Sequence, residues 1–238
     1  MEAAAFGLTV ISLAGLFDSA VNAFRYVQVG KAYGLDVQSS CLLLDNAQLR
    51  LSRWGQAIGL GTVTDGPVDL QETSFSEADV QRARMLLEHI LDLFKEAEAK
   101  SLKMQGSRSP SEAIDLEATL PPGSLALRRR VNEVCRRRQR SPGLIDKAKW
   151  AIYGKEHFEA LVSTVNRLVG DLVELFPTTR QAQQELCEQE VREMSSLTTW
   201  PDFLKTAEAT DTLMANAAIK VQQQAVGIPA SPDASKLI

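Results

Sequence analysis

The chain has 238 residues, enough for one large domain or two small ones, and its 45% hydrophobic content can fill a core. A net charge of −4 gives no general attraction to nucleic acid. The chain has only two histidines. Its three cysteines, Cys41, Cys135 and Cys187, lie too far apart in the sequence for a metal-ligand motif. Such widely spaced cysteines are typical of reduced cytosolic thiols. We therefore expect a soluble, cytosolic, helical protein without metal, cofactor or nucleic-acid partner.

Residues 3–24 form a mostly apolar segment whose only charge is Asp18, and its length approaches that of a membrane-crossing helix. Apolar side chains favour insertion by about 3 to 5 kcal/mol in total, and Asp18 opposes it by up to about 3.5 kcal/mol. The apolar residues counted are Phe6, Leu8, Val10, Ile11, Leu13, Leu16, Phe17, Val21 and Phe24. Since Ser, Thr and Asn side chains oppose insertion further, a single copy would insert poorly and an assembly could do better. The segment is predicted to rest as a buried helix; a secretory signal fits less well, because no basic region precedes it.

A second helix is predicted from an N-cap at Asp36 to about Ile58. Its apolar residues recur every three or four positions, at Leu44, Ala47, Leu51, Trp54 and Ile58. This face is broad enough to contact more than one neighbour, and Arg50 and Arg53 are expected on the opposite side.

After a predicted loop over 59–73, Ser76 is expected to cap a helix that runs to about Met104, with Asp79 in a capping box. Its apolar face comprises Val80, Ala83, Leu87, Ile90, Phe94 and Ala97. A Ser-, Pro- and Gly-rich loop is predicted next, over 105–124.

The following helix is expected to be capped by Ser124, and it is rich in arginine. The block consists of Arg128, Arg129, Arg130, Arg136, Arg137, Arg138 and Arg140. Three interpretations remain open: a solvated face with acidic partners inside the protein, a surface for anionic lipid, or a nucleic-acid contact. The first is favoured, and among the functional ones lipid is preferred, because no aromatic residue is interleaved for base stacking.

The remaining segments complete an all-helical pattern. A short piece over 144–154 precedes a helix over 155–176 that Pro177 ends, and a polar helix over 181–194 is available to neutralise the arginines. A last helix over 202–226 leads into a tail with the composition of a disordered end. We predict an all-α, single-domain bundle of about seven to nine helices over 1–226, with at most a minor β element. Residues 1–28 would form its apolar N-terminal part and 227–238 a flexible tail.

Motifs for phosphate cradling, dinucleotide binding or a nucleophile elbow are absent from the sequence, so an enzyme is not expected. Several strings instead carry a family resemblance. DNAQLRLSRWG, at 45–55, is the most specific, and AGLF near the start, ILDLF at 90–94 and AKWAIYGK at 148–155 agree with it. The chain thus resembles the HeLo domain of fungal heterokaryon-incompatibility proteins of the HET-s/HET-S type. The motif residues of interest are Asp45, Gln48, Leu49, Leu51, Trp54 and Gly55.

This resemblance implies a cell-death effector, cytoplasmic at rest, whose N-terminal segment is released to permeabilise membranes. In the family, a C-terminal prion-forming segment becomes an amyloid that remodels the HeLo domain, which can also dimerise. Expected partners are therefore membrane lipids, a second copy of the chain, and an amyloid-forming or NLR-type activator encoded elsewhere. The 238 residues contain no Asn/Gly-rich, β-prone repeats, so amyloid activation stays open. The alternative is a helical interaction or regulatory module that never inserts.

Overall fold

The computed structural model describes residues 2–29, 37–61, 75–105, 120–140, 150–152 and 154–226. The fold is all-α, as predicted, with eight α-helices in this part of the chain. They are α1 (Glu2–Ala23), α2 (Gln38–Ala57), α3 (Glu77–Gln105), α5 (Pro122–Arg137), α6 (Lys155–Leu175), α7 (Arg180–Met194), α8 (Trp200–Ala207) and α9 (Thr212–Val226). Two short 3-10 helices, η1 (Phe24–Tyr26) and η4 (Pro177–Thr179), continue α1 and precede α7.

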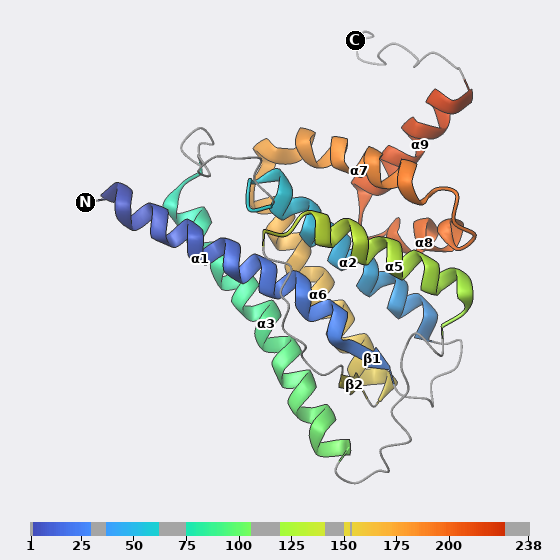
Figure 1. The fold of residues 1–238 in the computed structure, drawn as a ribbon, viewed down its shortest axis with the longest axis horizontal. Helices are drawn as coiled ribbons and strands as arrows, with labels where there is room; N and C mark the ends of the chain where they lie inside the picture. Colours follow the sequence, from blue (N-terminus) through green and yellow to red (C-terminus); the bar gives the residue numbers. More distant parts are fainter. Residues whose placement is uncertain are drawn as a thin grey trace, which may run out of the picture.

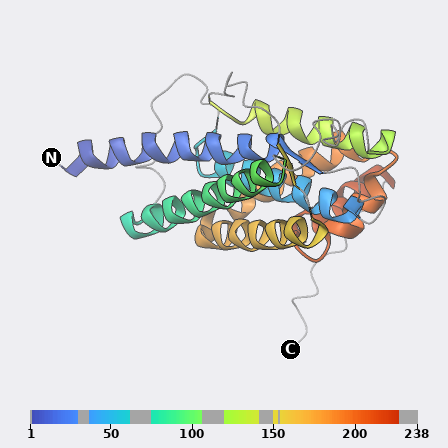
Figure 2. The same cartoon turned by 90° about the horizontal axis from the view of Figure 1, so that it is seen from below.

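Helix α2 is the centre of the bundle. In Figure 2 it lies between α5 on one side and α6 on the other, and it also contacts α7 and α8. The predicted apolar face is confirmed, since Leu44, Ala47, Leu51, Trp54 and Ile58 are all buried. The other faces of α2 are largely buried too, and this agrees with the broad apolar face that the sequence predicts for this helix.

Helix α1 lies beside α3, and its N-terminal end runs out beyond the other helices (Figures 1 and 2). The predicted apolar face of α3 is buried at Val80, Ala83, Leu87, Ile90 and Phe94. The capping box at its start is confirmed: the Ser76 hydroxyl accepts the Asp79 N–H at 3.1 Å and donates to the Asp79 carboxylate at 2.7 Å. These bonds satisfy a backbone donor that the first turn of a helix leaves free.

The minor β element consists of two three-residue strands, β1 (Val27–Val29) and β2 (Trp150–Ile152). They pair in parallel, with Val27 opposite Trp150 and Val29 opposite Ile152. The structure thus has a strand where the sequence predicted part of a short helical piece, while Ile152 is buried as expected. Parallel strands require a long connection, and here the chain between them includes helices α2, α3 and α5.

Other boundaries differ from the prediction. Helix α5 begins at Pro122 rather than after a cap at Ser124, because proline fits the first turn, where no backbone N–H is needed. Ser124 is instead buried and accepts a hydrogen bond from Gln38 Nε2 at 3.2 Å. The cap expected at Asp36, most of both predicted long loops and the predicted tail lie outside the described residues.

Candidate functional site

The second half of α1 is built into the core. Leu13, Phe17 and Val21 are buried, and Phe24 continues the same face into η1. Leu16 is half-buried, packed against this core. Phe6, Leu8, Val10 and Ile11 belong to α1, but their side chains lie outside the described part of the structure.

Aromatic contacts hold this half of α1 in place. Phe24 packs edge-on against Phe94 of α3, with ring centroids 4.9 Å apart. The ring of Phe17 packs against that of Trp54 in α2, with ring centroids 6.3 Å apart, and lies directly over Gly55. Helix α3 is the more extensive partner of α1, and α2 contributes mainly at Phe17.

Polar groups of the bundle also bind the backbone of α1. Gln139 Nε2 donates to the carbonyl oxygen of Asp18 at 3.0 Å, and Gln48 Nε2 donates to that of Val21 at 3.3 Å. Asp18, the single charge of the apolar segment, is itself only 8% exposed. Its burial fits the expectation that this segment rests inside the fold. Among the helices that the structure describes, none combines the length and apolarity needed to span a membrane.

The residues that carry the family resemblance are buried together on α2. They are Asp45, Gln48, Leu49, Leu51, Trp54 and Gly55. Asp45 accepts a hydrogen bond from Arg128 at 3.0 Å, and Arg128 also donates to the carbonyl oxygens of Phe24 and Val27. Burial raises the pKa of Asp45 to about 6, although Arg128 opposes that shift. This motif therefore joins α5 and the end of α1 to the central helix.

Arg53 forms a buried ionic cluster that the sequence analysis missed. Its guanidinium binds Glu190 of α7 at 2.7 Å and Asp211 at 3.0 Å, and Arg138 binds the second oxygen of Glu190. Burial alone would lower the pKa of Arg53, but Asp211 and Glu190 hold it well above its usual range. Asp211 also caps α9 by accepting the Met214 N–H at 3.1 Å. The sequence places Arg50 and Arg53 on the side opposite the apolar face, but both are buried, and Arg53 joins α2, α7 and the start of α9.

The arginine block does not form one continuous surface. Arg128 and Arg138 are buried in the pairs just described, which removes both from the predicted lipid patch in this conformation. Arg130 pairs with Glu133 and Arg137 with Glu193 at the surface. Arg140 donates to the backbone oxygens of residues 59 and 61. Arg129 and Arg136 are exposed. The arginine block therefore provides ion pairs with acidic residues of the protein and also a basic surface that is smaller than the predicted patch of seven arginines.

The three cysteines are buried and free. Burial raises the pKa of Cys41 and Cys135 to about 12, and that of Cys187 further still. At neutral pH they are thiols rather than the thiolates that act as nucleophiles or metal ligands. In the described ranges, no group of three or more potential ligands is placed to hold a metal ion.

These features define an all-helical domain that keeps the second half of its apolar N-terminal helix inside a bundle tied together by buried ion pairs. The HeLo family, described as prion-inhibition and propagation, matches residues 5–200. The chain belongs to this family, as its motifs suggested.

Two relatives from Podospora anserina extend the comparison. The chain is 32% identical to heterokaryon incompatibility protein s over 96% of its own length and 78% of the relative. It is also 32% identical to heterokaryon incompatibility protein S, over 94% of this chain and 76% of the relative.

Solved structures of the HET-s N-terminal domain share the fold. One of them superposes with a TM-score of 0.73 and 31% sequence identity, covering 90% of this chain and 99% of that one. A doubly substituted form gives a TM-score of 0.75 and 31% identity over 89% of this chain and 98% of its own length. The match thus includes nearly the whole solved domain.

Proposed function

We propose that this protein is a cell-death effector of heterokaryon incompatibility, cytoplasmic at rest, which permeabilises membranes once α1 leaves the bundle. The observation that carries the proposal is the burial of the apolar second half of α1 against α2 and α3. Membership of the HeLo family and the names of the Podospora relatives support the biological setting.

The energetics require a trigger. Exposing Leu13, Phe17, Val21 and Phe24 to water would cost about 6–12 kcal/mol at about 1.5–3 kcal/mol for each side chain. The free energy of unfolding of a typical domain is only about 5–15 kcal/mol, so the cost of releasing α1 is comparable to the whole stability of the fold. Spontaneous release is therefore rare, and an activating partner or a weakened α1 contact is needed to populate the open state.

The released segment would act at the membrane as an assembly. The net free energy of inserting residues 3–24 into a membrane is near zero for one copy. Several copies that pair their polar side chains would insert more favourably. The exposed arginines Arg129 and Arg136 supply attraction to anionic lipid worth about 1 kcal/mol each near the membrane surface.

Gly55 offers a direct test. A Cβ atom at this position would lie 2.1 Å from a ring carbon of Phe17, so Gly55→Ala must displace Phe17. We expect a loss of about 1–3 kcal/mol in stability and faster dye release from phosphatidylcholine–phosphatidylserine vesicles than with the unchanged protein. Thermal unfolding and vesicle leakage are measured on the same samples.

Two controls separate release of α1 from general instability. Gly15→Ala changes an exposed position of α1 with no atom within 4 Å, and it should leave leakage unchanged. Val191→Ala removes buried methyl groups from α7 and should destabilise the fold without freeing α1. Leakage that follows stability alone, equally in Gly55→Ala and Val191→Ala, would contradict the proposal. No leakage from any variant would favour the non-inserting interaction module.

A further inference from the structure

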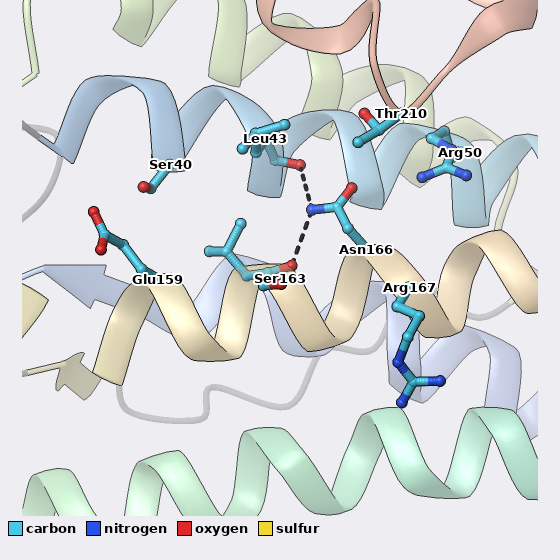
Figure 3. A pocket seen from close by; sticks show the side chains of 9 residues that line it. Ser40, Leu43, Arg50, Glu159, Ser163, Asn166, Arg167 and Thr210 are labelled. Atoms are coloured by element: carbon cyan, nitrogen blue, oxygen red, sulfur yellow. Dashed lines mark hydrogen bonds between the residues drawn. The ribbon is translucent and has the colours of Figure 1, made fainter. Parts of the chain in front are cut away.

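A pocket of about 490 Å³ lies between α2 and α6, beside the turn that joins α8 to α9 (Figure 3). Its size falls within the range of about 300–1,000 Å³ that is usual for small-molecule sites. Leu43 and Val162 provide apolar wall, while Arg50 and Glu159 lie toward opposite ends. The pocket is separate from the packing surface of α1.

Arg50 is the unusual residue of this pocket. It is only 8% exposed, yet it makes no hydrogen bond or ion pair with the residues that the structure describes. Buried arginines are almost always paired, because leaving water without a compensating contact is costly. The neighbouring carboxylate of Asp211 is engaged by Arg53, and burial lowers the pKa of Arg50. Glu174 is a second acidic neighbour of Arg50, but it forms no ion pair with it in the described residues. No Arg50 nitrogen is among the described buried polar atoms that lack a partner, so the guanidinium is open to the pocket and available to a ligand there.

Asn166 presents the complementary group. Its Nδ2 donates to the carbonyl oxygens of Leu43 at 3.4 Å and Val162 at 3.0 Å, which fixes the orientation of the amide (Figure 3). Its Oδ1 is buried and has no donor within the described ranges. A buried acceptor left in this way is costly unless a ligand or water supplies a donor. The site therefore has an unused cation and an unused acceptor from two different helices.

We propose that this pocket binds a small hydroxylated organic phosphate, whose phosphate pairs with Arg50 and whose hydroxyl donates to Asn166 Oδ1. Guanidinium groups bind phosphate through parallel hydrogen bonds, and the Ser163 hydroxyl, one turn before Asn166, can serve a further phosphate oxygen. Glu159 disfavours a second anionic group, and Arg167 is already paired with Asp171 at 3.1 Å. The ligand class is thus a molecule with one phosphate.

Binding would stabilise the closed bundle, because the ligand bridges α2 and α6 only while they are packed. At a free concentration ten times its dissociation constant, a ligand raises the folded-to-unfolded ratio about elevenfold. This inference stands apart from the membrane activity and holds whether or not α1 ever inserts.

The test is thermal unfolding of the full chain with glycerol 3-phosphate, compared with sodium chloride at equal ionic strength. The unchanged protein should gain melting temperature with the phosphate compound. Arg50→Met should melt no lower than the unchanged protein without ligand, because a buried unpaired charge is removed, and it should gain nothing from the compound. Arg167→Met, a surface control on the pocket rim, should keep the gain.

Nuclear magnetic resonance gives a second readout that does not depend on stability. Glycerol 3-phosphate should shift the Arg50 Nε–H and Asn166 side-chain signals in the unchanged protein, and Arg50→Lys should weaken the effect while keeping the charge. Equal thermal gains in the unchanged protein and in Arg50→Met would show a general solute effect and overturn the proposal, as would no gain at all from any phosphate source. An Arg50-dependent gain seen only with phosphatidic acid vesicles would assign the phosphate to a lipid head group.

Discussion

Asp45 and Arg128 form an ion pair whose side chains are only 4% and 9% exposed. Burial favours the neutral carboxylic acid, and this effect exceeds the attraction of Arg128, so the pKa of Asp45 rises from 3.8 to about 6. An acid whose pKa is higher in the folded than in the unfolded state binds its proton more tightly when folded. The stability that it contributes is therefore present below about pH 4 and lost as the pH rises through 6.

Replacing Asp45 by Asn should remove this pH dependence. The free energy of unfolding of the unchanged protein, measured relative to Asp45→Asn, is expected to fall by about 1–3 kcal/mol between pH 4 and pH 7. Urea unfolding at a series of pH values measures the difference, and Asp171→Asn, in an exposed pair with Arg167, serves as the control. A difference that is constant across this range would refute a raised pKa at Asp45.

Individual buried charges show where sequence reasoning stops. The spacing of Trp54 and Leu51 identifies the core face of α2, but the same periodic pattern places Arg53 on the opposite side and gives no sign that this side is buried too. Arg53 is buried because Glu190 and Asp211, distant in the chain, are folded against it. Only the packing of α7 and α9 on α2 reveals those partners, so the ionic cluster could not be found from spacing alone.

At the scale of elements, local chemistry is predictable where it is self-contained. The Ser76 cap needs only residues within one turn, and the structure has it as predicted. Strands β1 and β2 are three residues each, too short for an alternating pattern, and each depends on the other for its hydrogen bonds. The start of α5 was misplaced because serine is a common cap, whereas Pro122 fits the first turn equally well.

The cap of α3 has a measurable value. Ser76→Ala should reduce the free energy of unfolding by about 0.5–2 kcal/mol, because the Asp79 N–H loses its acceptor and the capping box is broken. Ser76→Asp keeps an acceptor at the cap and should cost less. Chemical denaturation of the three proteins measures this order, and equal stability of Ser76→Ala and the unchanged protein would show that α3 does not depend on its cap.

At the scale of the whole molecule, the bundle joins two groups of helices through α2 and α6, because α6 packs against both α2 and α3. One group, α1 and α3, is packed mainly by apolar and aromatic contacts; the other, α7 and α9, meets α2 at the ionic cluster. The two halves therefore respond differently to perturbation. Loss of an aromatic contact affects the release of α1, whereas loss of a buried carboxylate affects the C-terminal helices.

Glu190 tests the second half. Glu190→Gln would leave Arg53 and Arg138 buried with only the Asp211 carboxylate between them, and breaking a buried pair in this way costs about 3–5 kcal/mol. Glu193→Gln is the matched control, because it lies on the same helix and pairs with Arg137 at the surface, where a pair is worth about 0–1 kcal/mol. Hydrogen exchange should locate the loss of protection in α7 and α9 before α1 and α3. A similar small cost for both variants would mean that the buried cluster does not hold these helices on α2.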